Sequence, residues 1–77
     1  MSRKHQIAVD MIDSRFVQLS AGNTSAQLHA ETSMAIEMAH ALGAIDIGEH
    51  RYYVARQDRI LERQHKEILQ KLEGYRQ

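Results

Sequence analysis

The fold is decided by residues 46–77, which read DIGEHRYYVARQDRILERQHKEILQKLEGYRQ. An apolar residue recurs at every seventh position of this stretch: Ile47, Val54, Leu61, Ile68 and Tyr75. Seven residues are nearly two turns of an α-helix, so these side chains share one stripe of a single long helix. The stretch therefore predicts a helix over residues 47–75 with an apolar ridge along its length.

This ridge differs from that of a conventional two-stranded coiled coil. The second core position of each heptad is polar, with His50, Gln57, Gln64 and Lys71 in turn. A two-stranded coiled coil needs apolar side chains at both core positions to bury a continuous seam. We therefore expect the first half of the helix to be one side of an intramolecular bundle. Only the half beyond His65 is expected to be free for another chain.

A first, shorter helix is predicted over residues 2–21. Its apolar residues recur three or four positions apart, which gathers them on one helix face: Ala8, Ile12, Phe16 and Leu19. Gly22 follows the last turn, where glycine readily adopts the left-handed conformation that ends many helices.

A second helix is predicted over residues 25–42. Thr24 and Gln27 have the spacing of a capping box, in which each side chain serves a free backbone amide at the helix start. The expected apolar face consists of Leu28, Ala35, Met38, Ala39 and Leu42, widened by Met34 and Ala41. Its alanines allow a neighbouring helix to approach closely.

The connection between the second and third helices is short. Gly43 ends the second helix, and Asp46 with Glu49 forms a capping box at the start of the third. So short a connection makes consecutive helices pack antiparallel. The chain therefore predicts a single small all-α domain over residues 1–77, with three helices running up, down and up and an over-long third.

The helix lengths leave the end of the third helix uncovered. At ~1.5 Å per residue, the second helix spans roughly 27 Å and the third roughly 45 Å. Full burial stabilises an aliphatic side chain by roughly 1.5–3 kcal/mol relative to exposure, so we expect a homodimer or another protein partner to cover this end. The alternative is a frayed helix end that buries nothing. The predicted interface residues are Leu61, His65, Ile68, Leu69, Leu72 and Tyr75.

Composition narrows the class of protein. The 77 residues contain no cysteine, which excludes disulfides and thiolate metal sites, and their formal net charge is zero, which disfavours a polyanion binder. Small chains of this size often gain stability by oligomerising. No apolar run approaches the ~20 residues that span a bilayer, and no secretory signal is present, so a soluble cytoplasmic protein is expected.

A basic row follows the third helix on the side opposite the apolar ridge. It consists of Tyr52, Arg56, Arg59, Arg63 and Lys66, which fall within about a quarter turn of one another. The first interpretation is a solvated face, since Glu62 precedes Lys66 by four residues in the favourable order. The alternatives are a face for an acidic protein partner and, less favoured, a face for nucleic acid.

Two Glu-x-x-His pairs have the spacing of ligands in di-iron helical bundles: Glu37 with His40, and Glu62 with His65. Glu37 points away from the expected apolar face, whereas a metal at a bundle centre needs inward ligands. We therefore predict no metal site and no cofactor. His65 borders the expected interface, and the other histidines show no partner set that separates them from ordinary surface residues.

The sequence contains no Gly-x-Ser-x-Gly elbow, phosphate-binding glycine loop or His-Glu-x-x-His motif. We therefore expect a non-enzymatic regulator or inhibitor that binds a protein partner through helical surfaces, as a homodimer. In general character the chain is similar to small accessory proteins of phages and prophages, many of which bind and inhibit a host protein. The alternative function is a nucleic-acid-associated dimeric regulator that uses the basic row.

Overall fold

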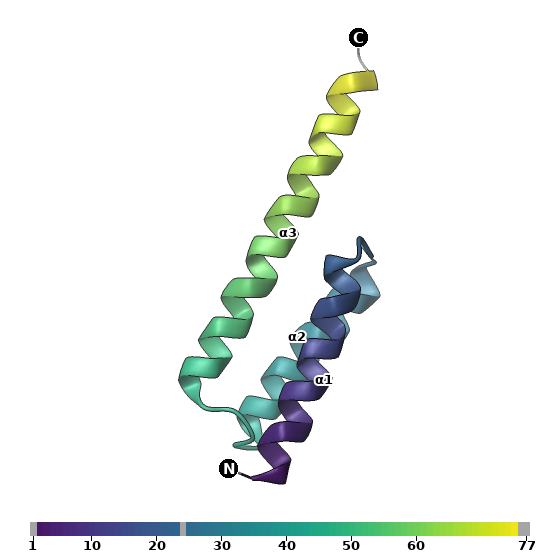
Figure 1. The fold of residues 1–77 in the computed structure, drawn as a ribbon. Helices are drawn as coiled ribbons and strands as arrows, with labels where there is room; N and C mark the ends of the chain where they lie inside the picture. The colour runs from purple at the N-terminus through teal and green to yellow at the C-terminus, as the bar shows by residue number, and fades with distance from the viewer. Residues whose placement is uncertain (1, 24, 76–77) are drawn as a thin grey trace.

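In the computed structural model the chain forms three α-helices joined by two short connections (Figure 1). The structure describes residues 2–23 and 25–75, with only the backbone for the last of these. The helices are α1 (Arg3–Ser20), α2 (Ala26–Ala41) and α3 (Ile47–Tyr75). The prediction of an all-α chain with three helices and the longest at the C-terminal side is confirmed, and each helix begins and ends within one residue of its predicted range.

The helix starts are fixed by side-chain caps. The Ser2 hydroxyl accepts a hydrogen bond from the His5 amide at 3.2 Å, and the Ser25 hydroxyl accepts one from the Leu28 amide at 3.1 Å. Each cap satisfies an amide that has no partner inside its helix. The predicted cap at Thr24 lies outside the described residues.

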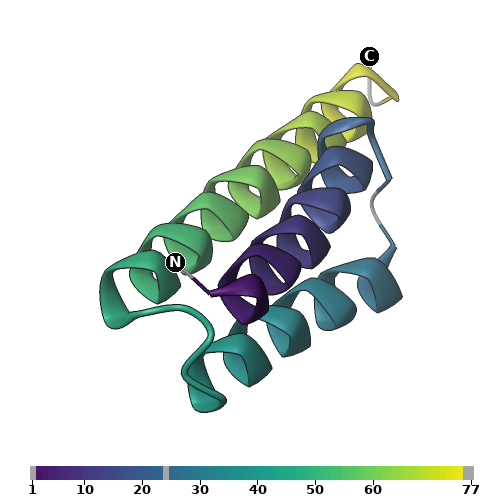
Figure 2. The same ribbon diagram turned by 60° about the horizontal axis from the view of Figure 1, so that its bottom comes forward.

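The corner between α2 and α3 is built as its sequence predicts. Gly43 has a φ of 73°, which suits glycine, and the Asp46–Glu49 capping box is formed in both directions. The Glu49 amide donates to the Asp46 carboxylate at 2.8 Å, and the Asp46 amide donates to the Glu49 carboxylate at 3.1 Å. This corner lies at the same end of the molecule as the start of α1 (Figure 2).

The apolar core lies between the three helices. It contains Ile12, Phe16, Leu19, Leu28, Ile36, Ala39, Ala44, Ile45 and Tyr53. The Phe16 and Tyr53 rings stack with centroids 5.8 Å apart, and burial raises the pKa of the Tyr53 phenol. The predicted inward face of α1 is confirmed.

The predicted apolar face of α2 is wrong in part. Leu28 and Ala39 are buried as expected, but Met38 and Leu42 are more than half exposed. Thr32 and Ile36 are buried instead. The face of α2 that packs against the other helices therefore does not carry the long side chains of Met38 and Leu42. The Thr32 hydroxyl donates to the Leu28 carbonyl at 2.7 Å, which makes its burial tolerable.

Helix α3 is held against the other two helices largely by polar side chains. Gln57, only 6% exposed, donates to the His29 carbonyl at 3.0 Å and accepts from the Ser33 hydroxyl at 3.1 Å. Gln64 is hydrogen-bonded to the His29 ring at 2.9 Å. Two of the second core positions of the heptad, Gln57 and Gln64, therefore face inward, whereas the last of them, Lys71, is exposed.

The ridge formed by every seventh residue lies to one side of the α3 face that packs against the core. Val54 packs against the core, whereas Ile47 and Leu61 are exposed. The expectation that the whole first half of the ridge covers the bundle is wrong for these two residues. Among the described residues, no helix is both long enough and apolar enough to cross a membrane.

Candidate functional site

The end of α3 carries the predicted apolar interface. Among the described side chains of α3, Gln64 is the last with a hydrogen bond to another helix or connection, and α3 continues past the α1–α2 turn (Figure 1). Along this end, Leu61, Ile68, Leu69 and Leu72 are 41–56% exposed. His65 is exposed beside them, and the side chain of Tyr75 lies outside the described residues. We call residues 61–75 the α3 end.

Past Gln64 the α3 end stays helical because its sequence favours a helix. It is rich in Leu, Lys, Glu and Gln, which have high helix propensity. Glu62 and Lys66, and then Glu67 and Lys71, are four residues apart in the order that stabilises a helix. Half-exposed aliphatic side chains on a regular helix form a surface suited to another helix.

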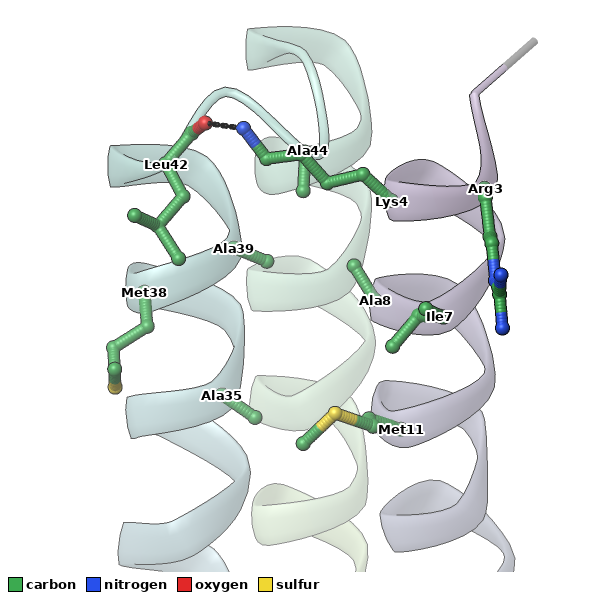
Figure 3. A pocket seen from close by; sticks show the side chains of 10 residues that line it. All are labelled: Arg3, Lys4, Ile7, Ala8, Met11, Ala35, Met38, Ala39, Leu42 and Ala44. Carbon is green, nitrogen blue, oxygen red and sulfur yellow. Dashed lines mark hydrogen bonds between the residues drawn. The ribbon is translucent and has the colours of Figure 1, made fainter.

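A second apolar surface lies between α1 and α2, on the side away from α3 (Figure 3). Small side chains form its floor, and longer apolar ones from the two helices form its walls. The volume is about 430 Å³. We call this the α1–α2 groove, and its apolar lining includes Ile7, Ala8, Met11, Ala35, Met38 and Leu42.

This groove was not predicted from the sequence. Its signal was present as Ala8 and Ala35, which are too small to fill the space between their helices, and as Met38, which was assigned to the apolar face of the second helix. Helical periodicity identifies the side chains that share a face, but not how wide a part of that face a neighbour covers. Here α1 and α2 meet along their smaller side chains and leave Met11 and Met38 about half exposed.

One end of the groove is positively charged. Arg3 and Lys4 line it, and the Lys4 ammonium donates to the Leu42 carbonyl at the end of α2. Both cations lie in the first turn of α1, which contains no acidic residue. A helix start carries a partial positive charge, so these cations are unfavourable for their own helix unless an anion approaches.

The predicted basic row is only partly free. Tyr52, Arg59, Arg63 and Lys66 are exposed on α3. Arg56 instead lies 4.5 Å above the centre of the Phe16 ring, with its guanidinium 4.0 Å from the Asp13 carboxylate. Its side chain is 40% exposed, so it packs between α3 and α1 and is less available to a ligand than the other four.

Histidines connect the helices. The His5 ring is hydrogen-bonded to the Glu49 carboxylate at 2.7 Å, and this contact, together with the Asp46 amide, holds the pKa of Glu49 below its usual value. The His50 ring is hydrogen-bonded to Glu37 at 2.8 Å and stacks on the His40 ring at 4.5 Å. These partners could not be predicted from the sequence, because they come from distant parts of the chain.

The two Glu-x-x-His pairs are not assembled into one site. Glu37 contacts His50 of another helix, and Glu62 and His65 are exposed on the α3 end. Within residues 2–23 and 25–75, no group of three or more His, Asp or Glu side chains is arranged to hold a metal ion.

The surfaces described above consist of aliphatic side chains and exposed cations, which can make apolar contacts and ion pairs. These side chains project from regular helices, whose ridges and grooves are suited to packing against another helix. No protein-family model, curated protein or solved structure matches the chain.

Proposed function

We propose that this protein is a small regulator that binds other proteins through its helical surfaces as a homodimer and catalyses no reaction. The observation that carries the proposal is the α3 end. Ile68, Leu69 and Leu72 follow Gln64, the last described α3 side chain that is hydrogen-bonded to another part of the chain, and each is about half exposed. Such contiguous apolar surface on a small protein is typical of an interaction site.

The basic row supports an acidic protein surface as the regulated partner. Arg59, Arg63 and Lys66 lie on the side of α3 away from the apolar ridge, so they stay accessible when the α3 end is covered. Tyr52 adds an exposed aromatic ring to the same side. Arginine and tyrosine are enriched among residues that dominate protein interfaces.

Light scattering tests the homodimer. The full chain, of 8.9 kDa, is expected to show about twice that mass at tens of micromolar. Ile68→Glu buries an unpaired charge in each copy, so its dissociation constant should rise by roughly 100-fold or more. The matched control is Gln70→Glu, which adds the same charge on the opposite side of α3 and should leave the mass unchanged.

A monomeric full chain at this concentration would contradict the proposal. Circular dichroism of both variants separates loss of association from loss of helix, because α3 should remain helical in each. A dimer that survives Ile68→Glu would show that another surface holds the two copies together.

The basic row also supports an alternative, a dimeric regulator associated with nucleic acid. This alternative is weaker, since the net charge is zero and Arg56 is engaged with Asp13 and Phe16. It predicts binding to DNA or RNA whose affinity falls linearly with the logarithm of salt concentration. The favoured function predicts no retention on nucleic acid near physiological salt and capture of an acidic protein that Arg59→Glu abolishes.

A further inference from the structure

We propose that the α1–α2 groove binds a long-chain carboxylate, such as a free fatty acid, with the alkyl chain lying between the two helices. The carboxylate lies at the cationic end of the groove, beside Arg3 and Lys4. Each chain binds one such ligand. This site goes beyond the proposed function, because it uses neither the α3 end nor the basic row.

The lining of the groove favours a ligand with an apolar body. Of the ten side chains that line it, only Arg3 and Lys4 are polar, and hardly any polar atom is exposed between the two helices. A ligand with hydrogen-bonding groups along its length would lose its bonds to water here without replacement. The volume of about 430 Å³ falls within the range of roughly 300–1,000 Å³ that is usual for small-molecule sites.

The groove is elongated along the helices. On α1 it extends from Lys4 to Met11, and on α2 from Ala35 to Leu42. Each of these segments advances by seven residues, which corresponds to a length of roughly 10 Å. A ligand that fills the groove is therefore extended and lies along the helix axes.

An unbranched alkyl chain suits this floor and these walls. It is narrow enough to reach Ala8 and Ala35 on the floor while it contacts both walls along its length. A helix of another protein is ~10 Å wide, so it would rest on the walls and reach the floor only with single side chains. Met11 and Met38 in the walls have flexible side chains that adapt to the shape of a ligand.

The polar end of the ligand is selected by Lys4. Its side chain extends from α1 across the end of the groove, where its ammonium donates to the Leu42 carbonyl (Figure 3). An ammonium has three N–H donors, so a bond to one carbonyl leaves others for a carboxylate. Arg3 adds a second cation at this end, and none of the described lining residues is acidic. An anionic head group is therefore favoured over a neutral or cationic one.

Isothermal titration calorimetry with decanoate tests the site, at a slightly alkaline pH and below the concentration at which decanoate forms micelles. The full chain is expected to bind one decanoate per chain in a saturable manner. Decanol and decyltrimethylammonium have the same alkyl chain without the negative charge, so they should bind roughly tenfold more weakly or less. Absence of saturable binding, or equal binding of the three compounds, would overturn the proposal.

A pair of variants on α2 tests the location. Met38→Glu places a charge in the groove wall and should weaken decanoate binding by roughly tenfold or more. The matched control is Met34→Glu, because Met34 is a methionine of α2 outside the groove with a similar exposed fraction, 60% against 54%. Both variants should keep the helical circular dichroism of wild type. Equal loss of binding in the two variants would overturn the groove as the site.

Lys4→Glu tests the carboxylate contact. It replaces attraction by repulsion, so decanoate affinity should fall roughly tenfold or more while decanol affinity stays within about twofold. The variant should fold, since a helix prefers an acid in its first turn. The control Arg51→Glu makes the same charge change at an exposed residue of α3 and should leave decanoate binding unchanged. Equal losses of decanoate and decanol affinity in Lys4→Glu would overturn Lys4 as the partner of the carboxylate.

Other outcomes distinguish this site from the other surfaces. Ile68→Glu should leave decanoate binding unchanged, and a loss would place the ligand on the α3 end and overturn the groove. Binding to vesicles of phosphatidylglycerol with none to free decanoate would overturn a soluble ligand in favour of a membrane surface. Capture of a partner protein that Met38→Glu abolishes, without decanoate binding, would assign the groove to that protein instead. None of these results decides the homodimer, which light scattering tests separately.

Discussion

Gln57 is the side chain through which the middle of α3 is held against α2. It is buried, yet its amide is paired at both ends, with the His29 carbonyl and the Ser33 hydroxyl. From sequence, its polarity at a heptad core position indicated that α3 is not a simple coiled coil, which is consistent with this bonding. Its burial could not be predicted, because the partners lie 24 and 28 residues away and no periodicity reports them.

Replacing this glutamine should be costly. Gln57→Ala removes the hydrogen bonds that this buried amide makes with the His29 carbonyl and the Ser33 hydroxyl, so the free energy of unfolding is expected to fall by about 1–3 kcal/mol. Urea denaturation followed by circular dichroism measures the change. The control Gln70→Ala removes an exposed glutamine from the same helix and should stay within about 0.5 kcal/mol of wild type. Equal effects of the two variants would contradict the role of Gln57.

Glu49 is expected to make the free energy of unfolding depend on pH. Its folded-state pKa is lowered by the His5 hydrogen bond and then by the Asp46 amide. A lowered pKa contributes stability that is present above the unfolded value of about 4.5 and lost as pH falls through the folded value. The melting temperature of wild type should therefore exceed that of Glu49→Gln near pH 7, and the difference should shrink below about pH 4.5. A difference in melting temperature between wild type and Glu49→Gln that stays constant across this pH range would contradict the contact.

The corner between α2 and α3 shows what sequence can predict at the scale of an element. Its glycine, its acid and its glutamate follow one another at intervals of three residues, so local spacing was enough to predict the helix ends. The apolar surface of α2 required long-range information instead. Its buried set depends on how closely α1 approaches, and the alanines allow an approach that leaves Met38 and Leu42 outside.

The capping box can be measured directly. Asp46→Ala removes the acceptor for the Glu49 amide and should lower the free energy of unfolding by about 0.5–2 kcal/mol. Asp58→Ala removes an exposed aspartate from the body of α3 and serves as the control, with a change within about 0.5 kcal/mol. A loss at Asp58 as large as that at Asp46 would indicate a general charge effect.

At the scale of the whole molecule, a chain of 77 residues buries few apolar side chains and leaves two apolar surfaces open. The α3 end was predicted from helix lengths, since ~1.5 Å per residue is a property of every helix. The groove was not, because it arises from the packing of two helices whose separation depends on side-chain size. The number and order of helices thus followed from the sequence, whereas the shapes between them did not.

Association should couple to stability. If folded chains pair and unfolded ones do not, the melting temperature of wild type should rise by several degrees between about 5 and about 500 µM. Thermal melts followed by circular dichroism measure this rise. Ile68→Glu should abolish the concentration dependence while retaining a cooperative transition. A wild-type melting temperature that does not change with protein concentration would contradict the homodimer.

The polar attachment of α3 has a consequence for how the molecule opens. Among the described side chains of α3, only Tyr53 is both apolar and fully buried, Val54 and Ile60 pack against the core while partly exposed, and Gln57 and Gln64 add hydrogen bonds. Water can replace these hydrogen bonds, so α3 should separate from the α1–α2 pair in a sub-global opening while that pair stays folded. Backbone amides of α3 should then exchange their hydrogens for deuterium before those of α1 and α2.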